Sequence, residues 1–246
     1  MLRYVVKRVL LAAITIFLVA TITFFLMRMV PGGPFIAEKS ISEQAQAALN
    51  AKFGLDKPVW VQYKNYMTGA LHGDFSLSLK QRGRTVSEII ASKFPISAKL
   101  GGLSVLIALA IGIPFGSIAA LNRGKWLDQL IMVIATCGIA FPSFVICTVG
   151  MYLFGVRLKW LPTFGLTSPL HYILPIFSLA FYPMAYITRL MRSSMLDVLD
   201  QDYMRTARSK GLSRSRSLFK HALRNAVLPV VTYVGPMLAY TLTGSF

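Results

Sequence analysis

Side chains able to act as acids, bases or nucleophiles are scarce in the long uncharged runs of this 246-residue chain. Three ionisable residues come near those runs, each close to a run's end: Arg28, Asp128 and His171. An ionisable residue within a membrane is a functional candidate by default, so their scarcity argues against a proton relay or a voltage sensor. His171 precedes Tyr172, which favours an interfacial position over a catalytic or ligand role.

Motifs that assemble catalytic or cofactor sites are also missing from the sequence. There is no HExxH, no GxSxG and no paired-cysteine motif, and Cys137 and Cys147 lie within one uncharged run as expected packing residues. The nearest fragment to a phosphate loop, ALNRGKW around Gly124, lacks the leading glycine and the hydroxyl after the lysine. We expect a protein that is not an enzyme and binds no cofactor or metal. If nucleotide drives it, ATP binds to a separate subunit.

The most distinctive polar segment is 202–229, DYMRTARSKGLSRSRSLFKHALRNAVLP, which stands between apolar runs. Acidic residues precede its first cations, an order that suits the dipole of a helix. Gly211 is placed to end that helix and Ser213 to cap a second one. The pattern therefore predicts two short helices around a glycine turn, with Leu212 exposed near the corner. Contact with acidic lipids and docking to a protein are equally good interpretations of these residues alone.

The amino-acid composition of the chain indicates the environment in which these residues lie. The chain is 55% hydrophobic and only 14% charged, which is typical of a membrane protein. Its formal net charge of +17 is distributed in blocks between apolar runs and not in one stripe, so anionic lipids explain it better than nucleic acid does.

Five uncharged runs approach or exceed the roughly 20 residues that a helix needs to cross a bilayer. Since only helices or closed barrels satisfy their backbone in lipid, we expect an all-α polytopic protein with five spans. No small-x-small cleavage site follows the first run, so it is read as a retained span and not as a signal peptide. The runs are Val9–Met27, Leu100–Leu121, Gln129–Val156, Trp160–Thr188 and Asn225–Phe246.

Cations occupy every second connection, which predicts a cytoplasmic N-terminus. They are Arg3, Lys7 and Arg8, then Arg123 and Lys125, then nine Lys and Arg residues between 189 and 224. The 31–94 region is then external, and its pattern predicts two small helices. Ser42 is placed to cap the first, and Asp56 and Pro58 to begin the second, which ends before Gly73.

The 202–229 segment resembles the glycine-containing EAA loop of permease subunits in binding-protein-dependent ABC importers. Aligned on Gly211, the family's Glu-Ala-Ala falls on Arg205, Thr206 and Ala207, so only the second alanine is kept. The peptide and nickel branch usually has RTARxKGL followed by HALRNxxLPV, which here begins at His221. The opening KRVLLAAITIFLVATITFFLMRMVPGGPF, GLDKPVWVQY, HGDFSLSL and FPISAKLG resemble that branch too, specifically the B-type permease of oligopeptide importers. The short connection between the third and fourth spans is similar to oligopeptide permeases more than to dipeptide permeases.

The resemblance implies a type I ABC importer permease fold in a bacterial inner membrane, with residues 1–93 as a first span plus external helices and 94–246 as the permease domain. Such permeases have six spans, so this chain, ending within its fifth run, is expected to be truncated. Implied partners are a second homologous permease, two cytoplasmic ATPase subunits that bind ATP, an extracytoplasmic peptide-binding protein and membrane lipids. The expected coupling residues are Arg205, Thr206, Ala207, Gly211, Leu212 and His221, with Ala207 and Gly211 in close contact and Leu212 as an apolar anchor. Nickel or dipeptide transport, and a channel or scaffold that works without ATP, are the alternatives.

Overall fold

A computed structural model describes residues 1–29, 50–51, 53–78, 81 and 83–243. Within these ranges the regular structure is helical, apart from one isolated bridge between Leu77 and Thr85. The expectation of an all-α membrane protein is thereby confirmed. Most of the external helix expected to begin at Ser42 lies outside the described residues, and only its end is described, where residues 50, 51 and 53 are helical. The chain divides into two compact units, Met1–Lys93 and Phe94–Phe246, which are described separately.

The first unit contains α1 (Leu2–Met29) and α3 (Val59–Leu71). No residue of α1 is buried within the part of the chain that the structure describes. Phe25 of α1 stacks on Tyr63 of α3 at 5.4 Å between ring centroids, and the Tyr63 hydroxyl is 2.8 Å from Thr21 Oγ1. Pro58 occupies the N-cap of α3, as expected for the second external helix.

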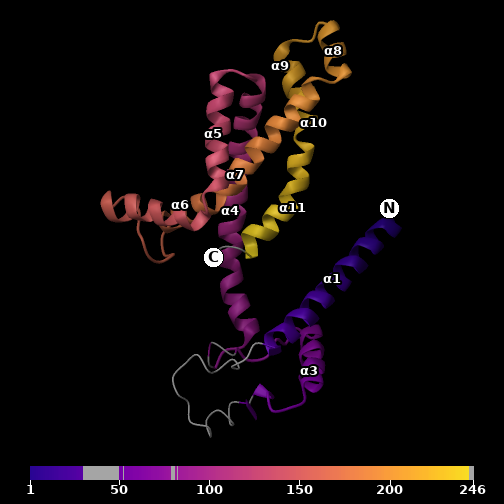
Figure 1. Ribbon diagram of the computed structural model, residues 1–246, viewed down its shortest axis with the longest axis vertical. Helices are drawn as coiled ribbons and strands as arrows, with labels where there is room; N and C mark the ends of the chain where they lie inside the picture. Colours follow the sequence, from indigo (N-terminus) through magenta and orange to yellow (C-terminus); the bar gives the residue numbers. More distant parts are fainter. Residues whose placement is uncertain (30–49, 52, 79–80, 82, 244–246) are drawn as a thin grey trace. The chain divides into compact units, whose positions relative to one another are not determined.

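The second unit is a helical bundle with a lobe of short helices at one end (Figure 1). The helix α4 enters it from the first unit and contacts α7 and α11, and α5 packs against α7. The element bounds are α4 (Val86–Leu121), α5 (Trp126–Ala140), α6 (Ser143–Gly150), the π-helix η1 (Met151–Arg157), α7 (Leu170–Leu199), α8 (Asp202–Ser209), α9 (Arg214–Arg216), the π-helix η2 (Ser217–Ala222), α10 (Leu223–Ala226) and α11 (Leu228–Thr243).

Among the described residues, three single helices are long and apolar enough to cross a membrane: α1, α4 and α7. Two bent pairs pass the same test together, so the total reaches the expected five if each pair is one span. The run Gln129–Val156, expected as one span, is bent by 100° between α5 and α6. Pro142 lies at the bend and Phe141 before it is extended, at φ −86° and ψ 127°. A proline disfavours helical geometry in the residue before it, which accounts for the break.

Glycines bring α4 and α5 close to α7. A Cβ built on Gly112 would lie 2.7 Å from Ile187 Cγ2, and one on Gly116 would lie 2.5 Å from the Thr188 carbonyl oxygen. On α5, a Cβ on Gly138 would lie 2.6 Å from Ala185 Cβ. Small residues permit such close contact between membrane helices, so these glycines allow α4 and α5 to pack directly against α7.

Candidate functional site

The 202–229 segment forms the two helices that its sequence predicts. The first, α8, is followed by Gly211 at φ +76°, a left-handed conformation that favours glycine. The Leu212 amide donates to the Ala207 carbonyl at 3.3 Å, the long bond of a Schellman turn. Ser213 Oγ accepts from the Arg216 amide at 3.4 Å and so caps the second helix. That helix continues through α9, η2 and α10, with its middle turn wound as a π-helix.

The inner face of the segment is part of the core of the second unit. Met204 is 1% exposed and Ala207 is 7% exposed, and Ala222 and Ala226 of the second helix are fully buried. Met204, Ala222 and Ala226 pack in one cluster with residues of α4, α7 and α11, namely Val105, Ala108, Ala120, Ile187, Met191, Met195, Val230 and Met237. The segment is therefore a folded part of the bundle and not a helix lying free on lipid.

Leu212 differs from its expected position. We expected it to be exposed at the corner, but it is half-buried and lines a pocket of about 490 Å³. The Schellman turn folds Leu212 back toward the helix, and it becomes half-buried because the ends of α4 and α7 lie beneath the turn. The other lining residues are Ala120, Leu121, Leu199, Met204, Ser217 and Leu218.

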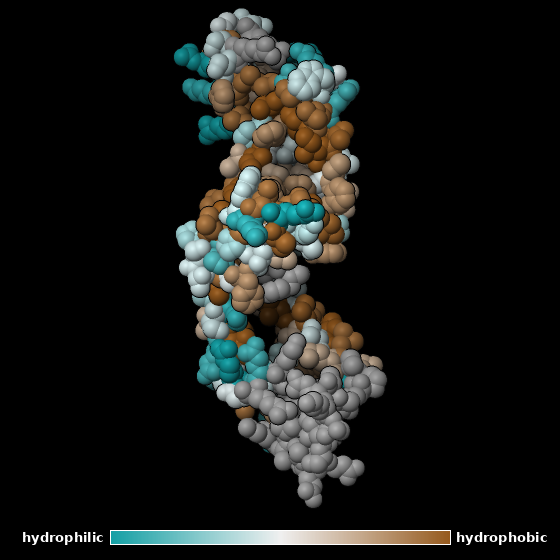
Figure 2. Space-filling view, turned by 90° about the vertical axis from the view of Figure 1, so that its left-hand side faces the viewer, coloured by the Kyte–Doolittle hydropathy of each residue, from teal (hydrophilic) through white to brown (hydrophobic). Residues whose placement is uncertain are grey.

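The outer face of the segment carries cations and aromatic rings. Arg205, Thr206 and Gly211 are exposed, and the side chain of Phe219 is open to the surroundings at 71% exposure. In Figure 2, hydrophilic residues project at the end of the molecule where Figure 1 places α8 and α9. The other exposed cations with described side chains are Lys210, Arg216, Lys220 and Arg224.

The two helices of the segment are joined by one polar side chain. Asn225 Nδ2 donates to the Tyr203 hydroxyl at 3.0 Å and to the His221 carbonyl at 3.2 Å. His221 itself is half-buried on the second helix. The structure thus brings Arg205, Thr206 and Gly211 together on the open side, and turns Ala207 and Leu212 inward.

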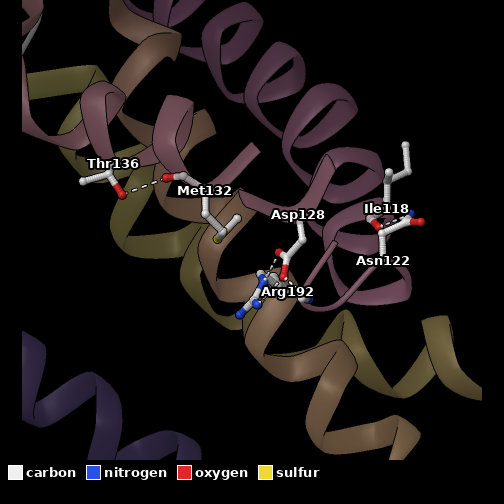
Figure 3. A network of polar contacts seen from close by, with 7 residues as sticks. Ile118, Asn122, Asp128, Met132, Thr136 and Arg192 are labelled. Atoms are coloured by element: carbon white, nitrogen blue, oxygen red, sulfur yellow. Dashed lines mark hydrogen bonds and ion pairs between the residues drawn. The ribbon is translucent and has the colours of Figure 1, made fainter. Parts of the chain in front are cut away.

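A second polar cluster ties α5 to α7 (Figure 3). Arg192 donates from Nε to Asp128 Oδ1 at 2.6 Å and from Nη2 to Asp128 Oδ2 at 2.7 Å. The Gly124 amide donates to the same Oδ2 at 3.0 Å, and Asp128 is only 3% exposed. Such a two-pronged arginine–carboxylate contact fixes both position and orientation. Arg189 adds a weaker link, from Nη1 to Thr136 Oγ1 at 3.4 Å.

The Asp128–Arg192 pair was not predicted from the sequence. We expected the apolar run that contains α7 to end at Thr188, and regarded Asp128 as an isolated residue near a run's end. Instead α7 continues unbroken to Leu199, which places Arg192 opposite Asp128. The available signal was one carboxylate early in one helix and an arginine late in another, both beside connections expected on the same side.

Metal coordination receives no support from the described part of the chain, where no three His, Cys, Asp or Glu side chains lie close enough together to hold an ion. Two polar features of the second unit are candidates for function: the outer face of the segment and the Asp128–Arg192 pair. Both are arrangements for contact and positioning.

Two family profiles match the chain. Residues 112–246 match "Binding-protein-dependent transport system inner membrane component", and residues 1–101 match the N-terminal region of such membrane components. Together these matches cover most of the sequence and include the whole 202–229 segment.

Three relatives show what the chain is similar to along its full length. The dipeptide transport system permease protein DppB of Bacillus subtilis (strain 168) is 44% identical over 246 residues, all of this chain and 80% of that protein. The oligopeptide transport system permease protein OppB of Haemophilus influenzae is 41% identical over 247 residues, covering 81% of that protein. The glutathione transport system permease protein GsiC of Escherichia coli O1:K1 / APEC is 42% identical, covering 80% of that protein. Because the dipeptide relative aligns over the whole chain, the short connection before α7 does not separate dipeptide from oligopeptide permeases.

Proposed function

Since this chain belongs to the inner-membrane components of binding-protein-dependent transport systems, we propose that it is the permease subunit of an ATP-driven peptide importer. The main support for this proposal is that the entire chain matches, at 39–44% identity, permeases named for dipeptide and oligopeptide transport. The protein is a multi-pass inner-membrane protein. It supplies one half of the passage, and a second homologous permease supplies the other.

The further partners of this proposal are two cytoplasmic ATPase subunits and an extracytoplasmic peptide-binding protein. ATP is bound and hydrolysed on the ATPase subunits, and this chain makes or breaks no covalent bond. The N-terminus and the 202–229 segment lie in the cytoplasm, because the cation-rich connections are retained on that side of the membrane. The same cations contact anionic lipid headgroups.

The outer face of the 202–229 segment is the ATPase-docking surface in this proposal. Its polar part consists of the side chains of Arg205 and Thr206 and the exposed backbone at Gly211. The exposed ring of Phe219 contributes an apolar anchor, and a few such anchors dominate binding energy at interfaces. Ala207 and Leu212 do not contact the ATPase directly in this proposal. Their side chains face this chain's own core and keep the glycine turn in its conformation.

Movement of the docking surface passes into the bundle through packed contacts. Met204 of α8 lies in the same cluster as Met191 and Met195 of α7, so a displacement of α8 pushes on α7. Because the Asp128–Arg192 pair links α5 to α7, α5 moves together with α7. Because α4 touches α7 closely at Gly116, α4 moves with them as well. Packed elements of this kind transmit coupling when they have two discrete arrangements. Peptide-dependent switching between such arrangements is the proposed role of these helices.

Reconstitution of the assembled importer in liposomes tests the proposal. Uptake of a labelled peptide should require ATP, the binding protein and this chain together, and the ATPase subunits should co-purify with it. Peptide flux that proceeds equally without ATP would favour a channel. Failure of any ATPase to co-purify through 202–229 would favour a membrane scaffold.

A further inference from the structure

A second pocket lies in the second unit, between α4, the connection before α7 and α7 itself. Its volume is about 440 Å³, within the range of small-molecule sites. The lining residues from α4 and α7 are mostly apolar, and among them only Ile176 is buried. These residues are Leu103, Ile107, Ile173, Ile176 and Phe177, with Leu166, Thr167, Ser168, Pro169 and Tyr172 along the connection and Lys99 as the charged member. Lys99 lies roughly 33 Å along α4 from Leu121, at about 1.5 Å per helical residue. The pocket at Lys99 is therefore separate from the pocket that Leu121 and Leu212 line.

Lys99 has donors to spare in this pocket. Its Nζ lies 4.2 Å from the centroid of the Tyr172 ring, a cation–π contact. No carboxylate among the described residues lies within ion-pairing distance of it. A lysine ammonium has three N–H donors, and a ring face engages only one side of it. An anion bound beside Lys99 would thus gain charge-assisted hydrogen bonds without displacing a protein partner.

The wall opposite α4 is held in place by hydrogen bonds of its own. The Ser168 amide donates to His171 Nδ1 at 3.2 Å, and Ser168 Oγ lies 2.7 Å from the same nitrogen. Because Nδ1 accepts from an amide, the neutral ring carries its proton on Nε2. This contact holds the connection at Ser168 against the first turn of α7.

We propose that this pocket receives the carboxyl-terminal residue of a peptide on the external side of the membrane. The Lys99 ammonium binds the terminal carboxylate, and the apolar lining takes the last side chain. The inference rests on the proposed function and its orientation. A terminal carboxylate is common to all linear peptides while side chains vary, so one cation over an unspecialised apolar hollow suits a carrier of varied peptides. Complementary charge is what commits the site to this occupant.

The test compares a tripeptide ending in leucine with its carboxyl-amidated form, using the assembled importer in liposomes with saturating binding protein. Lys99→Gln should raise the half-saturating concentration for the free acid about tenfold, the scale of one lost charge-assisted hydrogen bond. The amidated peptide should be unaffected, and Lys99→Arg should preserve the preference for the free acid. Because the binding protein is unchanged, a change in the acid-to-amide ratio reports on the permease.

Two controls keep the test decisive. Lys93→Gln removes an exposed cation of the same helix that does not line the pocket, and should leave the ratio unchanged. Thr167→Glu, on the exposed rim, should mimic the loss by pairing a carboxylate with Lys99, without altering α4. An unaltered acid-to-amide ratio in both Lys99→Gln and Thr167→Glu would overturn the proposal. So would a dependence of uptake on anionic lipid that Lys99→Gln removes while the ratio stays the same. Absence of ATP-dependent uptake of either peptide by the wild type would instead refute the proposed function.

Discussion

The bundle of α4, α5 and α7 differs from the 202–229 segment in how much of its surface is buried against neighbouring helices. In the bundle, glycines and a buried ion pair hold helices in contact on several sides, and a single added methyl group has no space at Gly116. In the segment, one face is buried while the other leaves Phe219 and several cations exposed. The difference separates two roles: the bundle must keep its shape, and the segment must remain available to a partner.

Mutations should separate the two roles. Substitutions in the bundle should mainly lower the stability of the protein. Substitutions on the open face of the segment should impair transport while stability is kept.

Asp128→Ala should have the largest effect on stability, because it leaves the Arg192 guanidinium without its partner. We expect a loss of about 3 kcal/mol, at the lower end of the range for broken buried pairs, since Arg192 is partly exposed. Thermal unfolding of the purified complex in detergent measures it. The matched control is Asp200→Ala, which removes an exposed pair with Arg123 at 4.0 Å and should cost less than about 0.5 kcal/mol. Equal losses in the two variants would contradict the buried clamp.

Gly116→Ala should come next, with a loss of about 2 kcal/mol, because its Cβ would approach the Thr188 carbonyl at 2.5 Å and backbone cannot easily move away. Gly102→Ala on the same helix is the control, since its Cβ would meet nothing within 4 Å. Helix propensity then favours alanine there by up to about 1 kcal/mol. Opposite signs in the two melting-temperature shifts are expected, and a common sign would argue against close α4–α7 packing.

Gly211→Asp should cost only about 1 kcal/mol, because aspartate tolerates the left-handed conformation better than most residues. Transport should nevertheless fall at least tenfold relative to ATP hydrolysis, since the side chain projects from the docking surface. Gly73→Asp provides the matched control, with φ +75° and open space in the first unit. Normal peptide uptake by the Gly211 variant would refute the docking role. Loss of membrane insertion or folding would show that the glycine only ends a helix.

Phe219→Ala should change stability least, by under about 0.5 kcal/mol, because the ring is mostly exposed. We expect the affinity for the ATPase subunits to fall about tenfold, the scale of an aromatic anchor at an interface. Titration of the purified ATPase onto the reconstituted permease measures this. Ala222→Leu, which overfills a fully buried position of the same helix, should show the reverse pattern, with lost stability as its primary effect. If the Phe219 variant binds the ATPase subunits with unchanged affinity, the ring is not part of the docking surface.

Local features were predictable because they depend on residues close in sequence. The start of α3 after Pro58 follows from the fixed backbone of proline, and the turn at Gly211 with its Ser213 cap follows from glycine and serine preferences. The direction of Leu212 was not predictable in the same way, because it depends on whether the ends of α4 and α7 lie beneath the turn. The coupling roles expected of Arg205, Thr206, Ala207, Gly211, Leu212 and His221 stay predictions.

Apolar runs of about twenty residues identify this chain as a helical membrane protein, because such runs have few other ways to satisfy their backbone in lipid. Motifs spread over the whole chain identify its family. Which polar groups meet is instead a matter of tertiary packing. Asp128 and Arg192 are 64 positions apart, and they pair because α7 continues past the apolar run and packs against α5. Contact between distant residues depends on how helices pack, and the spacing of residues along one helix does not specify that.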